Sequence, residues 1–320
     1  MKARIKIYRE STVKIGLFIG SIGSAGTVSG QVQQVLEAEQ DGFDSFWAAH
    51  IMDADIMTIF SMAGKITDKI QMGTAVTPTF LRHPIAMAQQ AITTSSATHG
   101  RFNLGMGVSH KPVVENRFGM KFHRPALHMQ EYLEIVQALA AKGSVDYEGE
   151  IFSATTTFTL SERHHLPVLI AALGPRMLKT AGQIADGTIT WMAGPETVKT
   201  HIVPTIQKAA IEAGKDKPRI VVALPLAVSD DKPAAFKQAS EHFERYGDLP
   251  SYKAMLNIEG VESPAEMAII GNEAEVEEKL RGFATAGATE IAAQIYPVGL
   301  DPVASVARSR ALLKHLVGRI

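Results

Sequence analysis

The chain has 320 residues and contains no cysteine. Disulfide bonds, thiolate nucleophiles, iron–sulfur clusters and cysteine-ligated zinc sites are therefore all excluded. A zinc site built from two histidines of one helix is not indicated either, because His123 and His128 are separated by five positions rather than four. We therefore expect no metal site.

A strong excess of one charge is also missing. Lysine and arginine number 32 against 33 acidic residues, which gives a net charge of -1. This balance favours neither a nucleic-acid nor a membrane partner, and no stretch approaches the roughly 18 uninterrupted apolar residues of a membrane span. The basic opening, residues 1–12, has no apolar segment behind it and so is no secretory signal. We expect a cytoplasmic protein whose partner is a small-molecule substrate.

The sequence does contain a regular alternation of short apolar runs with helical patterns such as Met129, Leu133 and Val136. This alternation is typical of a parallel sheet, and eight strand–helix units can close into a barrel that has no exposed edge. The expected strands are 14–20, 45–50, 70–76, 101–108, 167–172, 187–192, 219–228 and 290–297. We predict an α/β fold, a TIM (β/α)8 barrel with insertions, as a single domain over residues 1–320.

Three stretches interrupt this rhythm and are predicted to be the insertions. Residues 111–125 are expected to form a loop after the fourth strand. The stretch 145–165 begins with the alternation of a small hairpin, and 230–270 is predicted to be mostly helical. Because no linker divides the chain, these segments are expected to decorate one barrel.

In such a barrel the active site forms where the strands end, on the loops that follow. The residues at these ends are apolar and rich in glycine, and they include histidines but few acids. A hydrolase needs a carboxylate pair or a nucleophile with its base, and neither converges here. These surroundings suit a flat organic cofactor that brings its own chemistry.

Two glycine patterns were compared as phosphate sites. The GMG of residues 105–107 lacks the third glycine and the later acid of a dinucleotide fingerprint. The LGPRM of residues 173–177 fits better, because Pro175 suits a first helical position and Gly174 lets an anion approach the positive end of the helix dipole. Arg176 can add a bidentate contact. The residues alone fit an ordinary turn with a solvent-facing arginine equally well.

Six motifs taken together resemble the luciferase-like monooxygenase superfamily, and most closely its branch that uses the deazaflavin coenzyme F420. The resemblance covers about residues 13–315. In chain order the motifs are GLFIG, AEQDGFDSFWAAH, GTAVTPTFLRHP, GRFNLGMGVSH, AALGPRMLKTAGQIADGTITWM and GNEAEVEEKLRGFATAGATEI. The fold of this superfamily is a luciferase-like TIM barrel with insertions, in agreement with the strand count.

The resemblance implies a site for coenzyme F420, with FMN as the alternative cofactor. The segment 173–177 looks like the family's phosphate cradle. GTAV resembles the strand end at which the family has a non-prolyl cis peptide against the deazaflavin ring, here Ala75–Val76, and Val108 and Ser109 look like residues beside the ring. The implied cofactor-binding residues are Ala75, Val76, Thr77, Val108, Ser109, Leu173, Gly174, Pro175, Arg176 and Met177.

His50 and His110 are the candidate catalytic residues. His50 resembles the family histidine after the second strand, a proton donor or an orienting group. The sugar-phosphate dehydrogenase branch has an Asp where this chain has Ala49, and a Glu base at the position of His110. Both differences argue against a sugar-phosphate substrate and leave two histidines, which titrate near neutral pH, as the acid–base groups. A purely structural role for either stays open.

Trp191 and Met192 are predicted to line the substrate pocket, although Trp191 fits a barrel cap equally well. We predict an oxidoreductase that transfers a hydride between coenzyme F420 and a small organic substrate, reducing an activated C=C or C=O bond. The alternatives are a monooxygenase that uses reduced FMN and a flavin-binding protein without turnover. The family further suggests a homodimer.

Overall fold

The computed structural model describes residues 12–20, 22–50, 53–160 and 162–320. The expectation that the basic opening of the chain is no secretory signal concerns residues 1–11, which lie outside the described ranges. Within the described ranges no helix combines the length and the apolar character needed to span a membrane.

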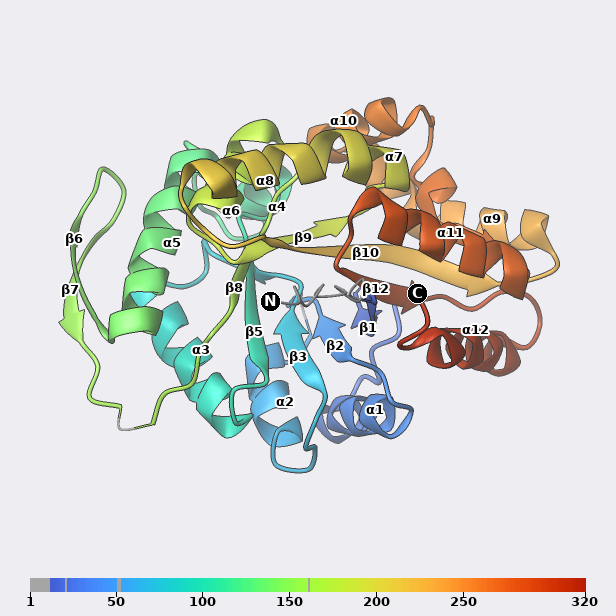
Figure 1. Ribbon diagram of the computed structural model, residues 1–320, viewed down its shortest axis with the longest axis horizontal. Helices are drawn as coiled ribbons and strands as arrows, with labels where there is room; N and C mark the ends of the chain where they lie inside the picture. The colour runs from blue at the N-terminus through green and yellow to red at the C-terminus, as the bar shows by residue number, and fades with distance from the viewer. Residues whose placement is uncertain (1–11, 21, 51–52, 161) are drawn as a thin grey trace, which may run out of the picture.

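Eight parallel strands form a closed barrel in the part of the chain that the structure describes (Figure 1). The ring closes where β12 pairs with β10 on one side and with β1 on the other. The predicted (β/α)8 barrel is confirmed, and each expected strand is present with small differences at its ends. In barrel order the strands are β1 (Lys14–Ile19), β2 (Ser45–Ala48), β3 (Gln71–Thr74), β5 (Phe102–Gly107), β8 (Val168–Ala171), β9 (Gly187–Trp191), β10 (Arg219–Val228) and β12 (Glu290–Ile295).

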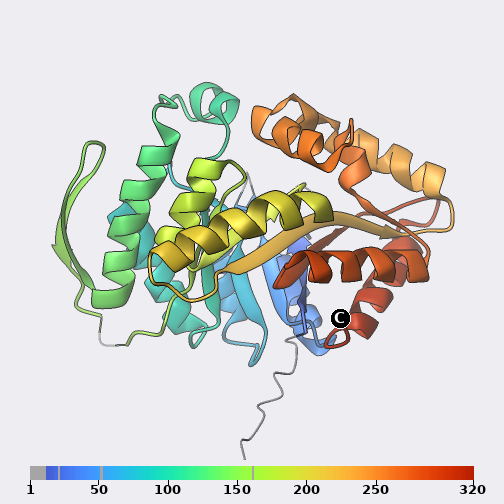
Figure 2. The ribbon, with the colours of Figure 1, turned by 45° about the horizontal axis from the view of Figure 1, so that its top comes forward.

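Helices surround this barrel, and the yellow α8 runs across the front of Figure 2. In helix α6, Leu178 and Ala181 are buried on one face. The surrounding helices are α1 (Val28–Gln40), α2 (Ile56–Ala63), α3 (Pro84–Ala97), α5 (Pro125–Lys142), α6 (Pro175–Gln183), α8 (Val203–Glu212), α11 (Glu273–Ala286) and α12 (Pro302–Leu316). Before α8 lie a short helix, α7 (Pro195–Thr197), and a π-helical turn, η1 (Val198–Ile202).

The insertion after β5 differs from the prediction. Residues 111–125 were expected to be a loop, but they begin with a helix, α4 (Lys111–Asn116). The reason is local: Pro112 in the first turn fits a helix start, and the carbonyl of His110 accepts hydrogen bonds from the N–H groups of Val113 and Val114.

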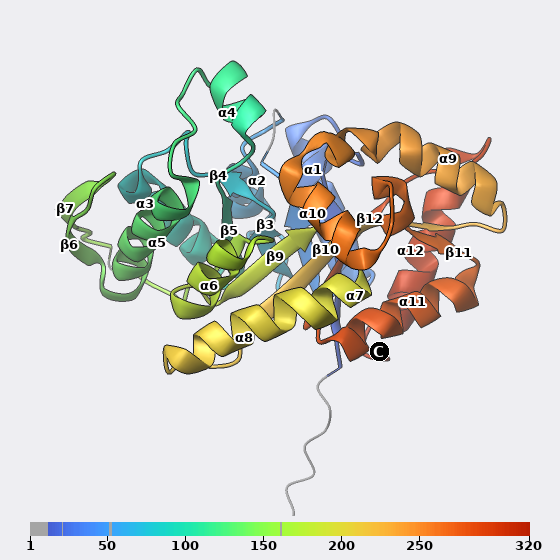
Figure 3. The ribbon, with the colours of Figure 1, turned by 90° about the horizontal axis from the view of Figure 1, so that it is seen from above.

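The other two insertions agree with the sequence pattern. The hairpin β6 (Ser144–Glu148) and β7 (Ser153–Thr157) stands at the edge of the molecule beside α5. The excursion 230–270 is mostly helical, as expected, with the short added strand β11 at its end. Its elements are α9 (Lys232–Phe243), η2 (Glu244–Asp248), α10 (Pro250–Glu259), η3 (Pro264–Met267) and β11 (Ile269–Gly271). Figure 3 shows α4 and α10 on the same side of the barrel.

A buried polar cluster fills the barrel at the N-terminal ends of its strands. The Glu290 side chain is only 1% exposed and forms an ion pair with Arg219 at 2.9 Å. The indole Nε1 of Trp47 donates to the same carboxylate at 2.6 Å. Because side chains alternate along a strand, Glu290 and Ala292 both point into the barrel. This end is therefore closed, and space for a ligand lies at the opposite end.

Candidate active site

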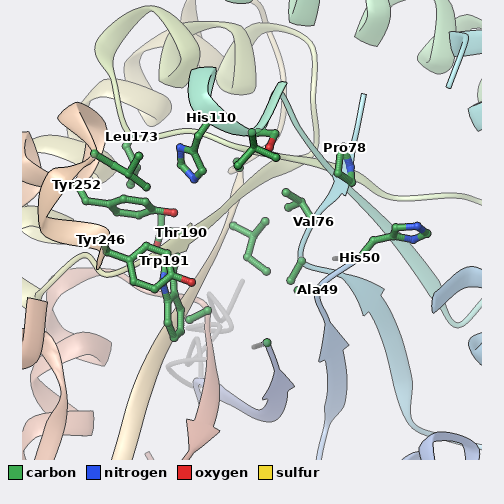
Figure 4. Close-up of a pocket in the computed structure, with 18 of the residues that line it drawn as sticks. Ala49, His50, Val76, Pro78, His110, Leu173, Thr190, Trp191, Tyr246 and Tyr252 are labelled. Atoms are coloured by element: carbon green, nitrogen blue, oxygen red, sulfur yellow. The ribbon is translucent and has the colours of Figure 1, made fainter. Parts of the chain in front are cut away.

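Two adjoining cavities open at the C-terminal ends of the barrel strands, and their volumes are about 420 and 490 Å³. The first lies over the barrel centre (Figure 4), and the second extends over the start of α6. Residues that line both cavities are Val76, Ser109, His110, Ala171, Leu173 and Tyr252. A ligand that passes these six residues can occupy both spaces at once.

A backbone bulge between β3 and β4 (Thr77–Pro78) forms one wall of the first cavity. The peptide bond Ala75–Val76 is cis, as the resemblance predicted. Two glycines of β5 make room for the bulge: a Cβ atom at Gly105 would lie 1.9 Å from the carbonyl oxygen of Thr74, and one at Gly107 would lie 2.5 Å from Val76 Cγ2. The GMG pattern is therefore explained by close packing against the bulge.

The second cavity contains the start of α6, where Gly174 is the N-cap and Pro175 follows it. The N–H groups of a first helical turn have no partner inside the helix, and the N-cap residue Gly174 has no side chain that could cap them. Arg176 and Met177 line the same space. A Cβ atom at Gly174 would meet no protein atom within 4 Å, so the cradle is open. This arrangement suits a phosphate group.

A histidine outside the predicted set holds the turn before this cradle. His201, in η1, places its ring nitrogen Nε2 2.7 Å from the carbonyl oxygen of Leu173, so Nε2–H donates to that oxygen. The contact spans 28 residues. The sequence gives no signal for it, because it depends on how the π-helical turn packs against the end of β8.

His50 lines the first cavity at its edge. Its Nε2 lies 3.5 Å from Arg82 and 3.9 Å from Asp55, which themselves form an ion pair at 2.6 Å. Burial and the nearby Arg82 lower the pKa of His50, and Asp55 only partly offsets them. These effects favour the neutral form of His50, and its buried Nδ1 has no hydrogen-bond partner among the described residues.

His110 lies directly over the first cavity and also lines the second. In Figure 4 it stands above the cavity between Leu173 and Pro78, whereas His50 lies at the far edge from Tyr252. The rings of His110 and Tyr252 are 5.5 Å apart. Burial lowers the pKa of His110. Of the two candidate histidines, His110 is therefore the better placed to meet a ligand held in both cavities.

Two predicted site residues lie outside both cavities. Met192 follows the last residue of β9 with a left-handed backbone (φ 55°), and its side chain is fully buried in an apolar cluster with Phe243. Thr77 is likewise fully buried, in the strand β4. The structure therefore does not bring these two residues into the lining of either cavity. The other predicted site residues line one or both cavities: His50, Ala75, Val76, Val108, Ser109, His110, Leu173, Gly174, Pro175, Arg176, Met177 and Trp191.

The insertion 230–270 supplies an aromatic wall that the sequence analysis did not identify. Tyr246 and Tyr252 line the first cavity beside Trp191. The ring centres of Trp191 and Tyr246 are 5.8 Å apart, and those of Tyr246 and Tyr252 are 5.2 Å apart. Gln294, on β12, is a further lining residue missed from sequence. The sequence does indicate this residue, because Gln294 follows Glu290 and Ala292 at intervals of two on β12 and therefore points into the barrel as they do.

Comparisons with known proteins find relatives in sequence and in fold. A 5,10-methylenetetrahydromethanopterin reductase from Methanopyrus kandleri is 31% identical over 214 residues, which make up 61% of this chain and 60% of the reductase. The fold is similar to that of an F420-dependent secondary alcohol dehydrogenase in complex with an F420–acetone adduct, with a TM-score of 0.77 at 20% identity over 94% of this chain and 98% of that one.

It is also similar to the oxygenating constituent of 3,6-diketocamphane monooxygenase from Pseudomonas putida, in complex with FMN. The TM-score is 0.71 at 17% identity, over 97% of this chain and 98% of that one. The sequence model of the luciferase-like monooxygenase family matches residues 13–290. Because this match spans most of the chain, the protein belongs to the luciferase-like monooxygenase family.

Proposed function

We propose that the protein is an oxidoreductase that binds coenzyme F420 without a covalent bond and uses it on a small organic substrate. The observation that carries this proposal is that the start of α6 and the Ala75–Val76 bulge line two cavities that adjoin each other. An open helix N-terminus at Gly174 adjoins a cavity backed by the Ala75–Val76 bulge. One end suits a phosphate and the other an uncharged planar ring. The similar fold of the dehydrogenase that was solved with an F420–acetone adduct supports the same choice.

The residues present fit this cofactor. The first turn of α6, with Arg176, would hold the phosphate. Val76 and Ala75 would support the ring from one side, and Val108 and Ser109 would lie along the chain that joins ring and phosphate. When bound, the deazaflavin supplies a two-electron carrier that transfers hydride.

The protein's own contribution is shape, exclusion of water and a proton. No aspartate or glutamate is found among the described residues that line either cavity. His110 is therefore the group best placed to hold or donate a proton at the substrate, through a ring nitrogen. His50, at the edge, is the second candidate. We propose the reduction of an activated C=C or C=O bond as the reaction.

One alternative is a monooxygenase that uses reduced FMN and oxygen. It is favoured by the fold shared with the FMN-bound camphane enzyme and by the same phosphate cradle, which does not distinguish FMN from F420. A cofactor-binding protein without turnover is the other alternative, because the cavity lacks a carboxylic acid.

Anaerobic incubation with reduced F420 and a panel of neutral enones and ketones tests the proposal. We expect the visible absorbance of oxidised F420 to reappear with at least one class of substrate. Turnover only with reduced FMN and oxygen would support the monooxygenase instead. Binding of F420 without its reoxidation by any member of the panel would favour the protein without turnover.

A further inference from the structure

A glutamine whose side-chain amide has no hydrogen-bond partner among the described residues lies at the inner end of the first cavity. Gln294 is 1% exposed, and it lines the cavity from β12. Neither its Oε1 nor its Nε2 has a hydrogen-bond partner in the part of the chain that the structure describes. Buried polar side chains in proteins are nearly always hydrogen-bonded. An amide with both ends free indicates a ligand that supplies the missing partner.

The surroundings keep this amide in place. A Cβ atom at Gly20 would lie 2.3 Å from Gln294 Oε1, so the absence of a side chain at position 20 makes room for the glutamine. Trp191 lines the same cavity, and its buried Nε1 also has no partner among the described residues. Two separate strands, β9 and β12, thus bring polar atoms that have no partner among the described residues to the first cavity.

The charges of the residues that line the first cavity determine which class of ligand can bind there. Of the described lining residues, the charged side chains are Arg117 and Arg245, both exposed, so the inner end has no formal charge. A carboxylate or phosphate that reached Gln294 would lose its hydration without meeting a cation. A carbonyl oxygen can accept from Nε2–H, and a hydroxyl group can donate to Oε1. One amide therefore serves a ketone and its alcohol alike.

We propose that Gln294 determines substrate specificity by binding the carbonyl or hydroxyl group of a neutral substrate whose planar part lies against Trp191, Tyr246 and Tyr252. The proposal deepens the function proposed above and rests on it. Gln294 does not line the second cavity, where the α6 cradle lies. Its position on β12, away from β5 and β8, assigns it to the substrate end of the site.

Tryptophan fluorescence provides a readout that does not depend on turnover. The chain has two tryptophans. Trp47 is fully buried and bonded to Glu290, whereas Trp191 lines the cavity. We would titrate the protein, with and without oxidised F420, with 2-cyclohexen-1-one and with cyclohexene, which has the same ring but no carbonyl. The wild type is expected to bind the enone and not the hydrocarbon.

Gln294→Met removes the amide and keeps the length of the side chain. We expect enone binding to weaken at least about tenfold, F420 affinity to stay within about twofold, and KM for the enone to rise more than kcat falls. Gln33→Met, an exposed substitution on α1, is the matched control and should leave all three unchanged. In Gly20→Ala the new methyl group displaces the amide without removing it, so enone binding should weaken there too.

Equal binding of both probes by the wild type, or binding of neither, would overturn the proposal. So would unchanged enone binding in Gln294→Met. A fall in F420 affinity in Gln294→Met would mean that the amide binds the cofactor, and this result would overturn the proposal as well. If the wild type bound the enone but not F420, the proposed function would fail while the role of Gln294 would still stand.

Discussion

Val76 Cγ2 would lie only 2.5 Å from a Cβ atom at residue 107, which is closer than two carbon atoms in contact can approach. The Ala75–Val76 bulge, which we propose supports the cofactor ring, is thus packed directly on a strand of the barrel, β5. No L side chain fits between them without a shift of one or the other. The position of the bulge and the glycine at 107 therefore depend on each other.

Gly107→Ala is expected to push Val76 into the cavity. Overpacking of this kind costs about 1–3 kcal/mol of unfolding free energy, and we expect F420 affinity to fall as well because the ring loses its flat support. Urea unfolding and a fluorescence titration with F420 measure the two effects.

Gly282→Ala is the matched control. Gly282 lies in α11, and a Cβ atom there would meet nothing within 4 Å. This change is expected to stabilise the protein by about 0.5–1 kcal/mol, as for glycine in a helix, and to leave F420 affinity unchanged. Similar behaviour of the two variants would contradict the packing argument.

Arg176→Ala tests the phosphate cradle. We expect F420 binding to weaken about tenfold, which corresponds to about 1.4 kcal/mol, because a charge-assisted hydrogen bond is lost. Lys179→Ala removes the same charge from an exposed position of α6 that lines neither cavity, and it should have little effect. Equal losses in both variants would indicate general electrostatic attraction rather than a defined contact.

His110→Gln tests the proton donor. Burial lowers the pKa of His110, so its protonated form is populated only below the usual histidine range. If that form donates the proton, the rate should fall as pH rises through the lowered pKa, and His110→Gln should lower kcat about 100-fold and abolish this dependence. Steady-state rates over a range of pH provide the measurement.

His164→Gln, at a half-buried position before β8 that lines neither cavity, is the control and should keep wild-type rates. His50→Ala separates the second candidate from the first. Near wild-type turnover in both His110→Gln and His50→Ala would exclude both histidines as the acid.

Arg219→Met tests the closed end of the barrel. The change leaves Glu290 buried without its cation, which is expected to cost about 3 kcal/mol or more of unfolding free energy. Arg281→Met breaks an exposed pair with Glu277 on α11 and should cost about 0.5 kcal/mol or less. Urea unfolding compares the two. A small effect of Arg219→Met would mean that water reaches Glu290.

The barrel could be predicted because its signals are local. Short apolar runs and the 3.6-residue period each depend on neighbouring residues, so the strands from Lys14 to Ile295 were found near their observed ends. The helix α4 was missed because its six residues are too few for a periodic pattern, and only Pro112 indicated its start.

The site could be predicted only in part. Gly174 and Arg176 follow a strand end directly, and their position follows from the strand itself. Tyr246 and Tyr252 come from an insertion whose path over the barrel depends on tertiary packing, which local patterns do not encode. Met192 was assigned to the pocket because it ends the predicted strand, but β9 ends at Trp191, and the left-handed backbone of Met192 leaves its side chain in the core.

The most direct test of the account compares two ligands by calorimetry: coenzyme F420 and the corresponding deazaflavin that lacks the phosphate and everything beyond it. The account predicts that both bind and that F420 binds at least about tenfold tighter, with the difference reduced in Arg176→Ala. Equal affinities for the two ligands, or no heat with either, would contradict a phosphate held at the start of α6.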